Sequence, residues 1–189
     1  MPTGWAIVVI VQWLAIVALA AVVLGLVRQG APAAEQTAES RELLFQNQGP
    51  AVGSKLPPFT GRDGSGGTLN AAQIVGRPAV LLFLSATCLP CVRLADEIAG
   101  SDPGDLADSL IVVTAPDGHE KLRLPASVRV LVMPDKEVAE VFTIKGRPFA
   151  IAVGADGVIR TKQGVNTVAQ LGGITASATS SRSPQVAAG

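Results

Sequence analysis

Two cysteines, placed where an apolar strand passes into a helix, constrain this chain more than any other feature. Residues 79–84 read Ala-Val-Leu-Leu-Phe-Leu, a continuous apolar run typical of a strand buried on both faces. Cys88 and Cys91 follow in the sequence Cys-Leu-Pro-Cys. Apolar residues then recur at helical spacing over residues 92–99, and Gly100 ends the pattern. The pair is therefore expected at a helix N-terminus.

This placement suits redox chemistry, because cysteine attacks as a thiolate and a helix N-terminus stabilises that anion. We expect Cys88 to be the exposed attacking sulfur. Cys91, one turn further in, is expected to be shielded and to resolve a mixed disulfide. Pro90 fits the first helical turn. Other interpretations are half of a zinc site, two inert buried cysteines, and a peroxidase in which Cys88 attacks peroxide.

Composition excludes several classes of protein. The chain has 189 residues, and 15 basic residues balance 15 acidic ones. With no long basic run, the sequence argues against nucleic acid as a partner. Two cysteines and one histidine are too few for a many-disulfide framework or a multi-histidine metal site. The length fits one membrane segment and one compact domain.

The N-terminal region predicts a membrane segment. Residues 1–27 contain no charged side chain. We expect residues 1–4 to be a short N-terminus and residues 5–27 a single transmembrane helix, since about 20 apolar residues cross a hydrocarbon core. A cleaved signal peptide is the alternative, supported by the Ala-Pro-Ala sequence at residues 31–33. The length of the apolar run and the lack of a preceding basic residue favour the anchor.

The side of the membrane on which the domain lies is a separate question. Arg28 and Arg41, both after the apolar run, favour a cytoplasmic domain by the positive-inside rule. Disulfide chemistry favours an oxidising, extracytoplasmic compartment. We give the chemistry more weight and expect a single-pass protein of the cell membrane with its domain on the periplasmic side.

The rest of the chain divides into three parts. Residues 28–48 predict a flexible linker, residues 49–173 a single α/β domain, and residues 174–189 a disordered tail. Within the domain, strands are expected at residues 79–84, 110–115, 128–132, 149–153 and 158–161, and helices at residues 92–99, 136–142 and 166–171. This order predicts a central mixed sheet flanked by helices.

The domain resembles the thioredoxin-like superfamily. The resemblance rests on the strand at residues 80–84, the Cys88–Cys91 motif and Pro148 ahead of the strand at residues 149–153. It implies a thioredoxin-like fold in which a cis proline faces the active-site disulfide, and Pro148 matches that position. An X-Pro bond is also where a cis peptide costs least.

The same resemblance assigns roles around the cysteines. It implies that Cys88 and Cys91 form a redox-active disulfide and that Pro148 docks the backbone of a client. Arg147 and Thr87, which precede Pro148 and Cys88, are expected to help position that client. A cation at Arg147, with Lys145 close by, would stabilise a Cys88 thiolate and make the disulfide more oxidising. The alternative is a solvated loop arginine.

An anchor joined to this domain is similar to the anchored, extracytoplasmic branch that includes the TlpA-like proteins. Residues 49–53, 86–91 and 164–167 are most similar to the MauD proteins of methylamine utilisation. That resemblance implies a protein thiol or disulfide as client, methylamine dehydrogenase under maturation among the candidates, with no cofactor. It leaves open the upstream redox partner and whether the chain acts as an oxidase, a reductase or an isomerase.

The sequence departs from the thioredoxin pattern and from the peroxiredoxin pattern at positions that bear on its function. Leu82 stands where thioredoxin has a buried acid, so the proton acceptor for Cys91 is not evident. The peroxiredoxin pattern P-x-x-x-T-x-x-C has Leu81 and Ser85 in place of its Pro and Thr, which disfavours a peroxidase. A peroxiredoxin-like antioxidant enzyme and a non-catalytic, membrane-tethered assembly factor are the rival functions. His119 lies in a polar loop and is assigned no role.

Overall fold

The structure is a computed structural model that describes residues 9–21, 45, 47–101 and 104–179. Two compact units divide the chain, Met1–Leu43 and Leu44–Gly189. The units are described separately below.

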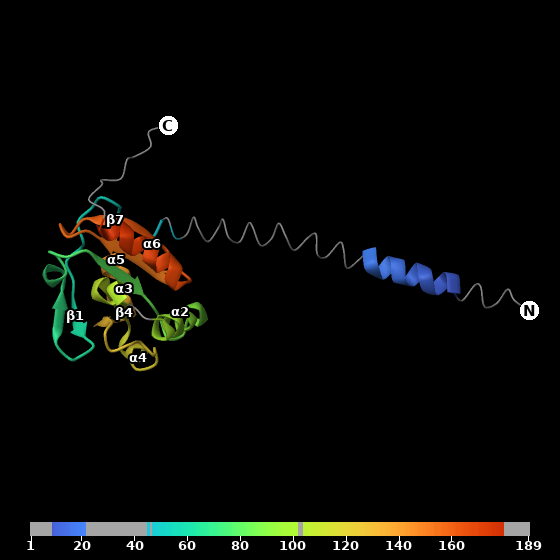
Figure 1. Ribbon diagram of the computed structural model, residues 1–189, viewed down its shortest axis with the longest axis horizontal. Helices are drawn as coiled ribbons and strands as arrows, with labels where there is room; N and C mark the ends of the chain where they lie inside the picture. The colour runs from blue at the N-terminus through green and yellow to red at the C-terminus, as the bar shows by residue number, and fades with distance from the viewer. Residues whose placement is uncertain (1–8, 22–44, 46, 102–103, 180–189) are drawn as a thin grey trace, which may run out of the picture. The chain divides into compact units, whose positions relative to one another are not determined.

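The described part of the first unit is a helix over residues 9–21 (Figure 1). Most of its side chains are exposed, among them Trp13, Leu14 and Leu19. Among the described residues, no helix combines the length and the apolarity that a membrane crossing requires. The remainder of the predicted span at residues 5–27 lies outside the described residues.

A seven-stranded sheet forms the centre of the second unit (Figure 1). Its strands lie in the order β2-β1-β5-β4-β3-β6-β7. The pairs β3–β4 and β4–β5 are parallel, and the other neighbours are antiparallel, so the expected mixed sheet is confirmed. The strands are β1 (Thr60–Asp63), β2 (Thr68–Asn70), β3 (Ala79–Phe83), β4 (Leu110–Thr114), β5 (Arg129–Val132), β6 (Phe149–Val153) and β7 (Ile159–Gly164).

Helices cover both faces of this sheet. Val80 and Leu82 of β3 belong to the same buried cluster as Leu94 of α2 and Leu171 of α6. Strand residues of the opposite parity, such as Phe83, belong to a second cluster with residues of α5. Because both faces are covered, the strand is apolar throughout. The helical elements are η1 (Ala71–Gln73), α2 (Leu89–Gly100), α3 (Gly104–Ser109), α4 (Pro116–His119), α5 (Asp135–Phe142) and α6 (Val168–Thr179).

The folded domain includes residues 45, 47 and 48, which were predicted to belong to the linker at residues 28–48. The ring of Phe45 stacks on that of Phe149, with centroids 6.1 Å apart. Gln48 is 6% exposed and hydrogen-bonds a loop 97 residues further along the chain. The local polar composition hid this docking, because the partners of both side chains lie far away in the sequence.

The predicted tail at residues 174–189 also begins too early, because α6 continues to Thr179. Ile174 and Ala178, one turn apart, are buried in the same cluster as α2. The segment was predicted to be disordered because it contains few large apolar side chains among its Ser, Thr and Ala residues. The hydroxyl of Thr167 accepts the backbone N–H of Gln170 at the start of α6. Residues 180–189 lie outside the described residues.

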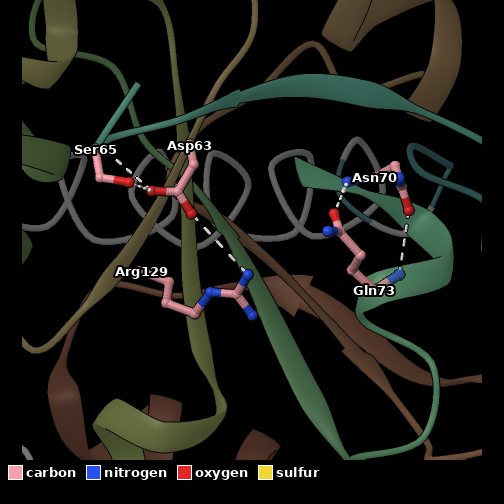
Figure 2. Close-up of polar contacts among 5 residues, drawn as sticks. All are labelled: Asp63, Ser65, Asn70, Gln73 and Arg129. Atoms are coloured by element: carbon pink, nitrogen blue, oxygen red, sulfur yellow. Dashed lines mark hydrogen bonds and ion pairs between the residues drawn. The ribbon is translucent and has the colours of Figure 1, made fainter. Parts of the chain in front are cut away.

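Polar side chains hold the turns around the β1–β2 hairpin (Figure 2). Asp63 accepts hydrogen bonds from the backbone N–H of Ser65 at 2.9 Å and from its hydroxyl at 2.8 Å. These bonds, with a smaller contribution from Arg129, hold the pKa of Asp63 below its ordinary value of 3.8. Asn70 and Gln73 cap η1 reciprocally, each side chain accepting the other's backbone N–H.

We expect Asp63→Ala to lower the free energy of unfolding by about 1 kcal/mol at neutral pH, because the turn loses two hydrogen bonds to a carboxylate. The pKa of Asp63 is lower in the folded state, so this stabilisation is complete above pH 3.8 and is lost as pH falls through the folded value. Denaturant unfolding at a series of pH values measures the difference. Asp117→Ala, at an exposed carboxylate, is the matched control. An undiminished difference at low pH would contradict the assignment.

Candidate active site

Cys88 is placed at the start of α2 by the turn that follows β3. Its backbone N–H donates to the carbonyl of Ser85 at 3.2 Å, which closes the turn. Cys88 is the N-cap of the helix, and its Sγ accepts the N–H of Cys91 at 3.4 Å. Pro90 lies in the first turn, as expected, and that turn holds no acidic residue. Sγ of Cys88 thus lies at the positive end of the helix dipole.

Cys88 and Cys91 form a disulfide, with their Cα atoms 5.2 Å apart, inside the usual range for such a bond. Cys88 is partly exposed, whereas Cys91 has no exposed surface. This difference is the one expected for an attacking sulfur and a resolving sulfur. Of the two sulfurs, Cys88 is therefore the one that solvent can reach.

The surroundings of Cys91 are apolar. The cluster that contains it includes Leu82, Leu94 and Ile98, all without exposed surface. In the described part of the chain, the buried polar side chains are Gln48 and Thr114, neither of which ionises near neutral pH. Leu82 therefore offers no substitute for the buried acid of thioredoxin.

The backbone just before Pro148 approaches Cys88 of the disulfide. The Arg147–Pro148 peptide bond is cis, as the resemblance implied. The carbonyl oxygen of Arg147 lies 3.5 Å from Sγ of Cys88, although 59 residues separate the two along the chain. In the reduced state a Cys88 thiol can donate to this carbonyl. Backbone groups of a docked client would meet the sulfur at the same edge.

A cleft of about 450 Å³ opens beside Cys88. Three segments form its walls: the loop after β3, the first turns of α5 and the loop before β6. The lining residues are Ser85, Cys88, Asp135, Ala139, Ile144, Lys145 and Arg147. The cleft thus offers both apolar and charged groups next to the reactive sulfur.

The charge of Arg147 is balanced by a neighbour that the sequence did not reveal. Its Nη1 donates to Oδ1 of Asp135 at 2.6 Å, and the arginine side chain is only 13% exposed. The expectation of an arginine near Cys88 is confirmed, since both residues line the cleft. The alternative of a solvated loop arginine does not fit this burial. The Asp135 carboxylate offsets part of the field of Arg147 at the sulfur, and stabilisation of a Cys88 thiolate by Arg147 stays a prediction.

The remaining candidate residues lie at the edge of the site or outside it. Thr87 is exposed and its hydroxyl hydrogen-bonds that of Ser85 at 3.0 Å. Lys145 is exposed and lines the cleft. His119 lines a different cleft of about 340 Å³, together with Asp63, and the cysteines take no part in it. The described residues hold no cluster of three or more metal-ligating side chains.

Sequence reasoning missed three residues that shape the site. Asp135 neutralises Arg147, Ile144 forms the apolar part of the cleft, and Gln48 holds the loop to which both Ile144 and Arg147 belong. Asp135 had a weak local signal, because an acid in the first turn of a helix is common for electrostatic reasons. Gln48 had none, since its partners follow about a hundred residues later.

Curated relatives of the chain carry one description. The sequence is 28% identical over 162 residues to the methylamine utilization protein MauD of Methylobacillus flagellatus, covering 84% of this chain and 78% of the relative. It is 27% identical over 164 residues to MauD of Methylorubrum extorquens, with the same coverage. No protein-family model matches the sequence.

Solved structures agree on the fold. MTB DsbF superposes with a TM-score of 0.55 at 19% identity, covering 68% of this chain and all of the other. The thioredoxin domain of a thiol-disulfide oxidoreductase from Bacteroides vulgatus superposes with a TM-score of 0.51 at 19% identity, covering 67% of this chain and 99% of that domain. The fold of the second unit is therefore thioredoxin-like.

The ion pair beside Cys88 makes a prediction for the reduced chain. Arg147→Ala leaves Asp135 unbalanced and should raise the apparent pKa of Cys88, whereas Asp135→Asn leaves Arg147 unbalanced and should lower it. We expect both shifts to be small, because the carboxylate is exposed and its charge is screened. The double variant should lie near the original value. Thiolate ultraviolet absorbance against pH measures all three.

Glu140 provides a matched control, because it lies on α5, the helix that carries Asp135. Glu140 is 64% exposed, pairs with Lys136 and does not line the cleft. Glu140→Gln removes one negative charge from α5, as Asp135→Asn does, and should leave the Cys88 titration unchanged. If Arg147→Ala moves the titration no further than Glu140→Gln does, the arginine has no electrostatic role at the sulfur.

Proposed function

We propose that this chain, a thioredoxin-like protein related to MauD, is a membrane-anchored thiol-disulfide oxidoreductase that acts on a protein client through Cys88 and Cys91. One observation carries the proposal: a partly exposed sulfur at a helix N-terminus is bonded to a buried one and faces the carbonyl before a cis proline. This arrangement supplies an attacking sulfur, a resolving sulfur and a backbone docking edge in one place.

In the reducing direction, the Cys88 thiolate attacks one sulfur of a client disulfide. A bond forms between that sulfur and Sγ of Cys88, and the other client sulfur leaves as a thiolate that takes up a proton. Cys91, as thiolate, then attacks Sγ of Cys88. The mixed disulfide breaks, the second client sulfur leaves, and the Cys88–Cys91 bond is restored. The client gains the electron pair that the cysteines lose.

In the oxidising direction, the same steps run backwards. A client thiolate attacks Sγ of Cys88 and Cys91 leaves as a thiolate. A second client thiolate then attacks the client sulfur held by Cys88, so the client becomes oxidised and the cysteines reduced. A thiol or disulfide partner resets the pair in either direction. Neither direction needs a prosthetic group.

The cleft beside Cys88 is the proposed client site. The carbonyl that precedes the cis Pro148 lies 3.5 Å from Sγ of Cys88, and this position supports docking of an extended client segment across the disulfide. The exposed Lys145 and Asp135 offer charges of opposite sign along this cleft. Ile144 and Ala139 offer apolar contact. We infer a client segment that places a small apolar residue next to its cysteine, with polar residues on either side.

The client and the compartment complete the proposal. The relatives are methylamine utilization proteins, and a disulfide-bonded protein of that process, methylamine dehydrogenase first, is the proposed client. The exposed apolar side chains of the helix at residues 9–21 support an anchor within residues 5–27. A cysteine pair that cycles through a disulfide supports an extracytoplasmic position for the domain.

We predict that Cys91→Ser accumulates a mixed disulfide between Cys88 and the client, because the resolving thiol is gone while the attacking one remains. Non-reducing electrophoresis followed by mass spectrometry of the adduct identifies the client. Cys88→Ser is the matched control and should trap nothing, since Cys91 is buried. Adducts with small thiols alone would count against a dedicated protein client.

The same variants separate the rival functions. Loss of the cellular function in the Cys88→Ser, Cys91→Ser double variant is expected for an oxidoreductase, whereas a tethered assembly factor would keep its function. Peroxide consumption by the purified chain at a rate above that of a free thiol would favour the peroxiredoxin-like alternative. We expect no such rate, given Leu81 and Ser85 at the positions of the peroxiredoxin motif.

Anchoring and orientation make a further prediction. The full chain should sediment with membranes and resist an alkaline wash, and Leu14→Lys with Val17→Lys should release it, because two charges in an apolar span are costly. In intact cells, a membrane-impermeant thiol reagent applied after mild reduction should label Cys88 in the wild type. Labelling only after lysis would place the domain in the cytoplasm instead.

A further inference from the structure

A short strap at residues 45–49, of which residue 46 lies outside the described residues, packs against the loop that precedes Pro148. Gln48 is the centre of this contact and is 6% exposed. Its Oε1 accepts the backbone N–H groups of Lys145 at 3.0 Å and Gly146 at 2.8 Å, and its Nε2 donates to the carbonyl of Gly146 at 3.3 Å. One buried side chain thus satisfies three backbone groups of the loop.

Other bonds fix the strap itself. The N–H of Gly49 donates to the carbonyl of Thr143 at 3.2 Å, at the end of α5. Nζ of Lys162 on β7 donates to the carbonyls of Gln48 at 2.8 Å and Gly49 at 3.1 Å. Gln48 is therefore held by its own backbone while its side chain holds the loop.

Packing adds to these bonds. The ring of Phe45 stacks on Phe149, the residue that follows Pro148. It also lies so close to two glycines that a Cβ would approach its ring to 3.2 Å at Gly146 and 3.0 Å at Gly164. Side chains at these two positions would push Phe45 away, so the close fit depends on their being glycine.

The loop that Gln48 holds is one wall of the active-site cleft. Ile144, Lys145 and Arg147 all line the cleft. The carbonyl of Arg147, one residue after the Gly146 group bound by Gln48, lies 3.5 Å from Sγ of Cys88. A shift of the loop would therefore move the docking edge relative to the sulfur, while Cys88 itself stays fixed by α2.

We propose that Gln48 is a positioning residue for client binding: it holds residues 145–148 in the geometry that docks a peptide across Cys88. The inference rests on the proposed function, and it adds a residue that does not itself line the cleft. Gln48 touches neither the sulfur nor a client, and it acts through the loop. Its loss should weaken binding of a peptide client and leave the chemistry at Cys88 intact.

The test uses the full chain with a fluorogenic peptide disulfide as substrate and dithiothreitol as reductant. Gln48→Met keeps the size of the side chain and removes its hydrogen bonds. We expect KM for the peptide to rise roughly tenfold and kcat to change little. The rate at which reduced Cys88 attacks a small aromatic disulfide should be unchanged, because that reagent needs no docking edge.

Two further variants separate positioning from a general loss of stability. Gln48→Glu keeps an acceptor for the N–H groups of Lys145 and Gly146 and should leave KM within about twofold of the wild type. Leu69→Ala destabilises the domain from β2, at the sheet edge opposite β7, and removes none of the hydrogen bonds that hold the loop. It should lower the melting temperature and leave KM unchanged.

Amide hydrogen exchange of residues 143–148 provides a readout that does not depend on activity. Exchange at Lys145 and Gly146 should accelerate in Gln48→Met and stay slow in Leu69→Ala. Unchanged exchange at both amides, an unchanged KM, or an equal fall in the rates with peptide and small disulfide would each overturn the inference. A wild-type chain that does not accelerate reduction of the peptide would refute the reducing direction of the proposed function, and the exchange data alone would then decide whether Gln48 holds the loop.

Discussion

The pairing register of β3 with β6 is the constraint on which the candidate site depends. Phe83, the last residue of β3, lies opposite Phe149, the first residue of β6. The chain leaving β3 towards Cys88 and the chain arriving at β6 from Pro148 must therefore meet at the same edge of the sheet. A slip of one residue would turn the side chains of β6 to the opposite face and lose both buried clusters. Core packing thus fixes the approach of Arg147 to the sulfur.

The two sulfurs obtain different environments from the same helix. Cys88 is the N-cap, with Sγ among backbone N–H groups and open to the cleft, so its thiolate is favoured. Cys91 faces the core side of α2 among apolar residues, where a thiolate is disfavoured. This asymmetry orders the proposed reaction, because the accessible sulfur is also the one that leaves and attacks more readily. It also predicts that resolution by Cys91 is the slower step, since no buried carboxylate among the described residues takes its proton.

The sequence revealed those parts of the molecule that are encoded locally. Three features were predicted from apolar periodicity and turn-forming residues within short stretches, and all three are present. They are the strand at residues 79–84, the helix start at Cys88 and the hairpin after Pro148. The cis bond at Pro148 came from a resemblance and not from any local pattern. Gln48, Asp135 and the last turns of α6 were missed, because each depends on a partner that only the folded chain brings close. The side-chain amide of Gln48 binds a loop almost a hundred residues away, so no periodic pattern near Gln48 indicates the contact.

Connectivity gives the strap a meaning beyond its contacts. The strap follows residues 28–44, the segment that joins it to the proposed anchor, so the first residues of the folded domain are also those that hold the loop before Pro148. An ordinary tether would end in a strand or a helix remote from the site, and the site would be indifferent to it. Here Gln48, Gly49 and Phe45 join the domain's entry point to the loop before Pro148 through bonds that depend on one another. Displacement of the strap would therefore move the wall of the cleft beside Cys88, while α2 holds the sulfurs in place.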